Sequence, residues 1–215
     1  MNVDPHLAPH WASAALITID MQRDFLSDRP FGLAGTTEIM PSLRSLTEAW
    51  RAAKRPIVHV VRLYPRTGDD IDRVRRTLIA SGVSFVSPGT PGRLLAPGLP
   101  PAGAPDLDDD LLLSGRPQPL GPGEYAVYKP RWGAFYRTPL ADLLTGHGVD
   151  TLAFAGCNLP NCPRASIIEA HERDFRVALA TDAVSQASEQ GFREIAGLGT
   201  TLFRTADLVA AITGA

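Results

Sequence analysis

The stretch TLAFAGCNLPNCPR, residues 151–164, places a cysteine where a buried strand gives way to a helix. Residues 151–155 are an apolar run typical of a buried strand, and residues 165–174 show the apolar spacing of a helix. Cys162 is therefore expected at a helix N-terminus, where Pro163 suits the first helical position. The helix dipole and the free backbone N–H groups favour a thiolate there and can bind an oxyanion. The stretch predicts a nucleophilic cysteine.

Strands and helices alternate on both sides of that stretch, which predicts an α/β fold with a parallel sheet. We expect strands at residues 14–20, 57–63, 125–129, 151–155 and 176–181. Helices are expected at residues 39–54, 69–80, 140–147, 165–174, 191–196 and 206–212. Residues 87–123 are rich in proline and glycine. They are expected to form an irregular excursion with one short helix or strand near residues 111–113.

Length and composition indicate a single domain over residues 1–215, with residues 1–13 as an N-terminal extension. The chain is 44% hydrophobic and carries a formal net charge of -2, so a small-molecule partner is favoured over nucleic acid. Neither a signal-peptide pattern nor an apolar run of membrane-spanning length is present, which predicts a cytoplasmic protein without membrane contact. Two cysteines make neither a disulfide framework nor a four-ligand zinc site.

Three chemically useful side chains stand at or just beyond the carboxyl ends of predicted strands. Asp20 closes the strand at 14–20, Lys129 closes the strand at 125–129, and Cys162 follows the strand at 151–155. Ligands bind at this edge of an open parallel sheet. We therefore expect the carboxylate, the ammonium group and the thiol to converge there, although each residue taken alone has an ordinary structural explanation.

Three segments around these residues resemble the motifs of the isochorismatase-like cysteine hydrolases. They are IDMQRDF at residues 19–25, YKPRWGAFYRTPL at residues 128–140, and GCNLPNC at residues 156–162, the last followed by a helix and then Asp182-Ala183. The motifs stand in the family order, and the similarity extends over residues 14–212. Any one of the three would be a weak signal, whereas the ordered set is specific.

The resemblance implies a three-layer, Rossmann-like fold, with about six mostly parallel strands and helices on both faces of the sheet. It also implies a catalytic triad of Asp20, Lys129 and Cys162, a cis peptide near Cys157–Asn158, and an oxyanion hole built from the backbone amides of Asn158 and Cys162. The sequence departs from the family inside this loop. Leu159 and Pro160 stand where the family usually has Thr and Asp, and Cys157 stands where it has a small aliphatic residue.

The chemistry expected of such a triad is amide hydrolysis through a covalent intermediate. Asp20 would take the thiol proton while Lys129 holds the carboxylate in place, and the Cys162 thiolate would attack a C–N carbonyl to give a thioester that water then releases. The aromatic residues Phe25, Trp132, Phe135 and Tyr136 are candidates for the substrate wall. Such aromatic side chains lie about as often in the core or at a subunit interface as in a substrate wall.

No metal or other cofactor is expected. Nicotinamidases resemble the triad but add an Asp-x-His and further histidines after the second strand, whereas that region here reads RLYPRTGD, residues 62–69. The substitution argues against a catalytic metal and against nicotinamide as the substrate. Isochorismatases proper lack the cysteine, so hydrolysis of a vinyl ether is disfavoured as well.

The substrate stays open at this level. The leading hypothesis is a small amide, carbamoyl or lactam compound, with streptothricin-type lactams, carbamoyl-sarcosine and ureidoacrylate as specific options within the family. Candidate groups for an anionic substrate are Arg62, Arg66, Arg131 and Arg164, and those for a cationic one are Asp69, Asp70 and Asp106. The alternatives are a redox-responsive or binding protein without turnover and, on weaker grounds, a flavodoxin-like nucleotide binder. The resemblance also predicts a homo-oligomer, either a dimer or a tetramer.

Overall fold

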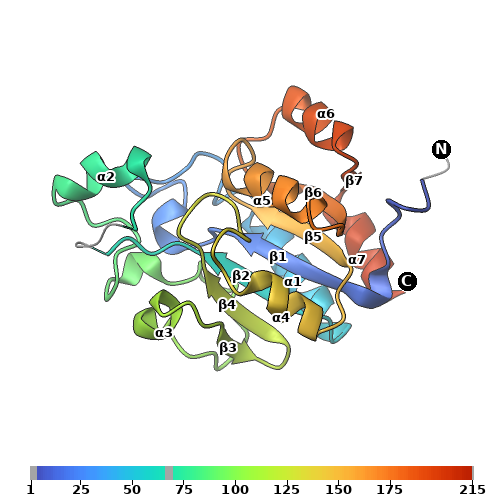
Figure 1. Cartoon of the computed structure of the whole chain (residues 1–215), viewed down its shortest axis with the longest axis horizontal. Helices are drawn as coiled ribbons and strands as arrows, with labels where there is room; N and C mark the ends of the chain where they lie inside the picture. Colours follow the sequence, from blue (N-terminus) through green and yellow to red (C-terminus); the bar gives the residue numbers. More distant parts are fainter. Residues whose placement is uncertain (1–3, 66–69, 215) are drawn as a thin grey trace.

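The computed structural model describes residues 4–65 and 70–214 and contains a single mixed sheet of seven strands in the order β3-β4-β2-β1-β5-β6-β7 (Figure 1). All neighbouring strands pair in parallel except β3 and β4, which are antiparallel. The strands are β1 Ala14–Ile19, β2 Ile57–Val61, β3 Gln118–Gly121, β4 Glu124–Tyr128, β5 Thr151–Gly156, β6 Arg176–Val184 and β7 Thr201–Phe203. The α/β class and the mostly parallel sheet predicted from the sequence are confirmed.

The helices are α1 Met40–Ala52, α2 Arg73–Ala80, α3 Asp109–Leu113, α4 Leu140–Gly146, α5 Cys162–His171, α6 Glu189–Gly197 and α7 Thr205–Thr213. Short 3₁₀ turns add Trp11–Ser13, Arg23–Phe25 and Pro91–Arg93. The helix expected at residues 69–80 begins at Arg73, and its first predicted residue lies outside the described part of the chain.

The two faces of the sheet are covered by different helices. Side chains of α1 and α7 form one core with alternate strand residues such as Leu16, and side chains of α4 and α5 form the other with the intervening residues such as Ile17. Figure 1 shows α4 and α5 in front of the strands and α1 behind them. This alternation is the pattern expected when both faces of each strand are buried, and it confirms the predicted three layers.

Two strands were missing from the sequence prediction. Strand β3 lies within the proline- and glycine-rich segment and contains Pro119, which is tolerated because an edge strand pairs on one side only. Strand β7 has only three residues, too few for a periodic pattern. The excursion is not detached from the domain, because Leu95, Leu107 and Leu112 pack with β4 and the end of β2 in a third buried cluster.

The loop that carries the cysteine leaves the sheet at a position where only glycine fits. Gly156 ends β5 with a φ of 122°, and a Cβ atom there would lie 2.3 Å from the carbonyl oxygen of Ile19. This close approach brings the end of β5 against the end of β1. The residues that follow the two strands are therefore adjacent in space.

Candidate active site

The carboxylate of Asp20 stands at the centre of the site. Asp20 follows β1 directly, with a backbone φ of 53°, and is 2% exposed. Its Oδ2 accepts a hydrogen bond of 2.9 Å from the Nζ of Lys129, a residue that follows β4 and is fully buried. In the sheet, β2 lies between β1 and β4, and the three strands are parallel. Both residues therefore lie at the same edge of the sheet. The Lys129 ammonium also donates to the carbonyl oxygen of Arg131 at 3.3 Å.

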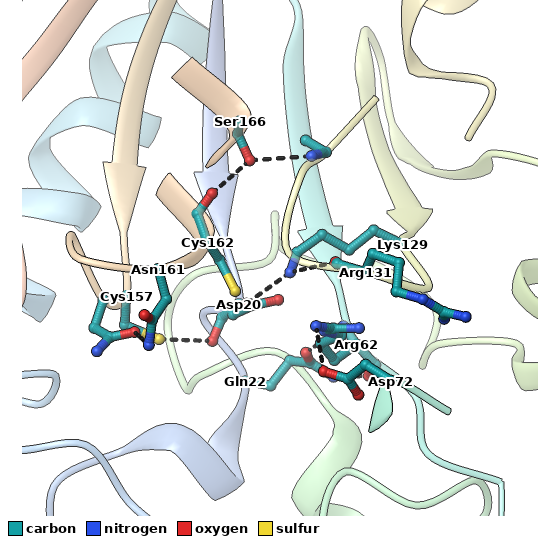
Figure 2. Close-up of polar contacts among 12 residues, drawn as sticks. Asp20, Gln22, Arg62, Asp72, Lys129, Arg131, Cys157, Asn161, Cys162 and Ser166 are labelled. Atoms are coloured by element: carbon teal, nitrogen blue, oxygen red, sulfur yellow. Dashed lines mark hydrogen bonds and ion pairs between the residues drawn. The ribbon is translucent and has the colours of Figure 1, made fainter. Parts of the chain in front are cut away.

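Cys162 is the first residue of α5, as its sequence predicts, and is 9% exposed. Figure 2 shows the Cys162 sulfur and the Lys129 ammonium both directed towards Asp20. The first turn of α5 is held from behind by Ser166, whose hydroxyl donates to the Cys162 carbonyl at 2.7 Å and accepts from the Ala134 amide at 3.1 Å. The structure thus brings Asp20, Lys129 and Cys162 together from three distant segments.

The protonation state of Cys162 differs from the sequence-based expectation. Burial, followed by the charge of Asp20, raises the pKa of the Cys162 thiol to about 11, and Lys129 and Arg62 oppose this shift only in part. We expected the helix N-terminus to favour the thiolate. In the resting site, however, the loss of hydration and the adjacent carboxylate outweigh that contribution. Cys162 is therefore a protonated thiol at neutral pH in the resting site, and a role as nucleophile would require removal of that proton.

Asp20 is only half satisfied by hydrogen bonds. Its Oδ1 is buried and has no hydrogen-bond partner within the described part of the chain, while Lys129 occupies Oδ2. A buried carboxylate oxygen without a partner costs about 1–3 kcal/mol or more. The unpartnered oxygen is an available acceptor for the thiol proton, since it belongs to the carboxylate towards which the Cys162 sulfur is directed (Figure 2).

The loop between β5 and α5 forms one wall of the site. The Cys157–Asn158 peptide is cis, as the family resemblance implies. The side chain of Asn158 donates to Gln186 at 2.6 Å and accepts from Asn161 at 3.3 Å, which fixes the loop from two sides. Across residues 4–65 and 70–214, the backbone N–H groups of Asn158 and Cys162 have no acceptor. Both residues line the pocket that contains the Cys162 side chain.

Two of the three residues by which this loop departs from the family pattern, Leu159 and Pro160, do not line the pocket that contains Cys162. Leu159 is 2% exposed and packs in the same core cluster as Ile195, and Pro160 is exposed. Both line a separate hollow beside α6. Cys157 does face the catalytic pocket, but its thiol donates to the Asp20 carbonyl at 3.3 Å, and burial raises its pKa well above the ordinary value.

A small pocket, with a volume of about 50 Å³, opens beside the triad. Its lining comprises Asp20, Phe25, Leu33, Arg62, Tyr64, Arg75, Trp132, Cys157, Asn158, Asn161 and Cys162. Two of the four predicted wall aromatics, Phe25 and Trp132, are among them. Tyr136 is 46% exposed and lines a neighbouring hollow together with Trp132.

The expectation that Phe135 contacts substrate is wrong. Its side chain is 5% exposed and packs on Phe175, with ring centroids 5.8 Å apart, while the Arg173 guanidinium lies 5.0 Å from the Phe135 ring centroid. Its amide donates to Glu169 of α5 at 2.8 Å. The backbone turn after Lys129 directs Phe135 into the core beneath α5, a change of direction that the spacing of the aromatics did not reveal.

Sequence reasoning missed several lining residues. Tyr64 stands two residues after Arg62 on the segment that follows β2, so the strand-end rule could have found it. Gln22, in the first motif, does not line the pocket but holds the same segment in place through hydrogen bonds to the Arg62 backbone. Its amide donates to the Arg62 carbonyl at 2.8 Å and accepts from the Arg62 N–H at 2.8 Å. Leu33 and Arg75 arrive from a loop and from α2, for which no local signal exists.

The candidate groups for substrate charge are now separated in space. Arg62 lines the catalytic pocket, whereas Arg131 lines the neighbouring hollow and Arg164 the hollow beside α6. Asp70 pairs with Arg131 at 3.3 Å, and Asp106 lines a distant hollow. The other two candidates, Arg66 and Asp69, lie outside the described residues.

Within residues 4–65 and 70–214, no three His, Cys, Asp or Glu side chains cluster in a way that could hold a metal ion. None of the helices described has the length and apolar character needed to cross a bilayer.

Comparison with known proteins places the chain in a family. Residues 14–207 match the Isochorismatase domain. The chain belongs to the isochorismatase family. A solved isochorismatase family protein from Desulfovibrio vulgaris is 30% identical and superposes with a TM-score of 0.79, covering 93% of this chain and 98% of its own.

Two relatives known by sequence carry functional names. An Arabidopsis thaliana protein named as a probable inactive nicotinamidase is 31% identical over 187 residues, which cover 86% of each chain. A ureidoacrylate amidohydrolase from Methylorubrum extorquens is 26% identical over 196 residues, covering 85% of this chain and 73% of its own. The family assignment therefore rests on nearly the whole domain rather than on an isolated motif.

Proposed function

We propose that the protein is a metal-independent cysteine hydrolase that cleaves a C–N bond of a small amide, carbamoyl or lactam substrate through a thioester on Cys162. The observation that carries the proposal is the Asp20 carboxylate, which is held by Lys129 at one oxygen, is left without a partner at the other, and lies next to the Cys162 sulfur (Figure 2). The amide hydrolysis named for the Methylorubrum relative supports the same class of reaction.

The first half-reaction forms the acyl-enzyme. Asp20 Oδ1 accepts the thiol proton as the Cys162 sulfur attacks the carbonyl carbon, and the C=O electrons move to oxygen. The resulting oxyanion accepts hydrogen bonds from the free amides of Asn158 and Cys162, each typically worth about 3 kcal/mol in the transition state. The oxyanion then collapses, the C–N bond breaks, and Asp20 returns the proton to the leaving nitrogen.

The second half-reaction releases the acid. Asp20, again ionised, takes a proton from water, and the hydroxide attacks the thioester carbonyl. Collapse of this intermediate expels the Cys162 sulfur, which recovers the proton from Asp20. Lys129 keeps the carboxylate oriented and offsets its charge throughout. Since no step requires a histidine, the absence of one from the described pocket lining is consistent with the chemistry.

The raised pKa of Cys162 determines how the proton moves. With a pKa of about 11, roughly one site in 10⁴ would hold a free thiolate at pH 7. The thiol is therefore the resting form, and the reaction must include transfer of its proton to Asp20. Binding of a substrate carbonyl against the free amides supplies the positive field that stabilises this step.

The decisive experiment combines a panel of small amides, ureido compounds and lactams with mass spectrometry of the quenched enzyme. We expect release of the amine or ammonia from at least one class, together with an added acyl mass on the peptide that contains Cys162. Turnover should survive treatment with a chelator. Full activity of the Cys162→Ala variant, or activity that a chelator removes and zinc restores, would refute the mechanism.

The Arabidopsis relative, named as a probable inactive nicotinamidase, motivates a second candidate function, a protein that keeps the fold without turnover. This hypothesis predicts no acyl adduct with any amide class. If the function is instead redox-responsive, mild oxidation should join Cys157 to Cys162, both of which face the same pocket. Two peptide maps distinguish the hypotheses. After peroxide treatment, a redox-responsive protein gives a peptide that contains a Cys157–Cys162 disulfide. After incubation with substrate, a catalytic Cys162 gives an acyl adduct that hydroxylamine removes.

A further inference from the structure

The catalytic pocket contains a buried cation that the hydrolytic mechanism does not use. Arg62 follows β2 and is 2% exposed, and its Nη1 is buried without a hydrogen-bond partner among the described residues. Its ion pair within the described part of the chain is a contact of 3.3 Å from Nη2 to Asp72. Figure 2 shows the guanidinium on the side of Asp20 away from Ser166, with Asp72 beyond it. Leaving a charged donor unsatisfied in the interior costs more than leaving a neutral one.

The Arg62 guanidinium remains charged in this setting. Burial lowers its pKa, but the coulombic effect of the ionisable groups around it, Tyr64, Asp20, Cys162 and Asp72, outweighs burial and raises the pKa above its ordinary value. The guanidinium carbon also lies 5.5 Å from the centroid of the Tyr64 ring. A planar guanidinium that stacks on an aromatic ring is oriented in advance for a planar anion.

The orphaned atoms of the Arg62–Asp72 pair do not both face the catalytic pocket. Asp72 Oδ1 also lacks a partner, but Asp72 lines the neighbouring hollow and is not part of the lining around Cys162. Within this pair, the unsatisfied atom on the catalytic side is therefore the donor, Arg62 Nη1, while the other unsatisfied atom of the pocket, Asp20 Oδ1, is the proposed proton acceptor. This asymmetry favours a ligand with an acceptor, and specifically an anion, at the Arg62 end of the pocket.

The other charged groups in and around the pocket also favour an anionic ligand. Lys129 offsets Asp20, and Asp72 offsets part of Arg62. Arg75, a third lining residue, forms no salt bridge among the described residues and lies over the Phe85 ring, 5.9 Å from its centroid. The pocket thus carries an excess of positive charge next to an unsatisfied guanidinium.

We propose that the pocket selects amides that carry a carboxylate, and that Arg62 binds this carboxylate while the amide carbonyl lies against Cys162. The inference rests on the proposed function and specifies its substrate class. The expected substrates are short monocarboxylates with an amide or ureido group at the other end. A neutral compound of the same shape would leave Nη1 unsatisfied and should be rejected.

The test uses matched pairs of compounds, succinamate with succinamide and N-carbamoylglycine with N-carbamoylglycinamide. For the wild-type enzyme, we expect kcat/KM to be at least about 10²-fold higher for the carboxylate of each active pair. The difference should appear mainly in KM and should shrink with added salt. Equal rates within the pairs, or a preference for the neutral compounds, would overturn the inference while leaving amide hydrolysis intact.

Arg62→Gln should lower kcat/KM for the carboxylates by about 10²-fold and for the neutral compounds by less than about fivefold. The ratio isolates anion binding, because the loss of the Arg62 charge also acts on Cys162 and affects both members of a pair alike. Arg62→Lys should give an intermediate ratio. The matched control is Arg164→Gln, which removes an arginine paired with Glu194 beside a different hollow and should leave the ratio unchanged.

Two further measurements keep the proposal testable if Arg62→Gln does not fold or no compound is hydrolysed. Arg75→Gln, on the half-buried face of α2, should reduce the preference for carboxylates several-fold, and an unchanged preference would count against the positive pocket. Calorimetric binding to Cys162→Ala requires no turnover. If carboxylates bind there and neutral partners do not, the anion site stands even if hydrolysis fails. Equal or absent binding of both would overturn it.

Discussion

Two buried ionic clusters lie on neighbouring strands of this sheet, and they differ in how completely they are satisfied. In the first, Glu124 at the start of β4 accepts from Arg51 at 2.8 and 2.7 Å and from His59 at 2.7 Å, and Thr18 contacts the other nitrogen of His59. In the second, at the opposite end of β4, Asp20 Oδ1 and Arg62 Nη1 are unpartnered among the described residues.

The difference distinguishes a structural cluster from a functional one. Around Glu124, the charge and hydrogen-bond contacts outweigh burial and lower the pKa of the carboxyl, so the ion pair is complete without a ligand. Around Asp20, one acceptor, Asp20 Oδ1, and one donor, Arg62 Nη1, have no hydrogen-bond partner among the described residues. Buried polar groups are nearly always paired. The unsatisfied atoms therefore indicate where substrate atoms belong, whereas burial or charge alone would have selected both clusters equally.

The largest effect should come from the nucleophile. We expect Cys162→Ala to lower kcat by at least about 10³-fold, because removal of the thiol leaves only binding and the free amides. Thermal stability should change little. Cys157→Ser, which keeps a donor for the Asp20 carbonyl, is the matched control and should retain most activity. Equal losses in the two variants, measured under saturating substrate, would contradict the assignment of the nucleophile.

Asp20→Asn should give two opposite effects. Turnover should fall by about 10²–10⁴-fold, because the general base is lost. Alkylation of Cys162 by iodoacetamide at pH 8–9 should become faster, because the Asp20 charge raises the pKa of the thiol and its removal lowers that pKa. In the wild type, the alkylation rate should keep rising with pH up to about 11. A wild-type plateau near neutral pH would contradict the structure.

Breaking the satisfied cluster should affect stability without affecting chemistry. Glu124→Gln is expected to lower the free energy of unfolding by about 3–5 kcal/mol, since it leaves Arg51 and His59 without their counter-charge. Urea denaturation would measure this loss, and the control is Glu194→Gln, a partner in a surface ion pair whose removal should change the stability little. A change in the alkylation rate of Cys162 in Glu124→Gln would show that the clusters are coupled.

The smallest effect is the pH dependence of that stability. The folded pKa of Glu124 lies below the ordinary value of 4.5, so its contribution is complete above that pH and is lost as the pH falls through the folded value. Acid titration of the wild type followed by circular dichroism should therefore show a loss that Glu124→Gln lacks. Identical acid transitions in the two proteins would place the titrating carboxylates elsewhere.

Local patterns in the sequence predicted most of the sheet. Strand β1 and strand β5 are continuous apolar runs, and α5 begins at Cys162 as its strand-to-helix turn indicates. The missing strands, β3 and β7, are short or contain proline, so neither has a periodic signal. The sequence predicted Phe135 in the substrate wall, but the structure places its side chain in the core. The direction of a side chain after a loop depends on how that loop packs, here against α5, and the sequence does not show this packing.

The sequence by itself determined the family, the class of fold and the identity of Asp20, Lys129 and Cys162, because strand ends and motif order are local properties of the chain. Only the tertiary structure decided the electrostatics. It buried Cys162 beside Asp20, which raises the thiol pKa instead of lowering it, and it placed Arg62 in the pocket while sending Arg131 and Arg164 elsewhere. Hydration and the distance between charges depend on contacts between distant segments, so no local pattern encodes them.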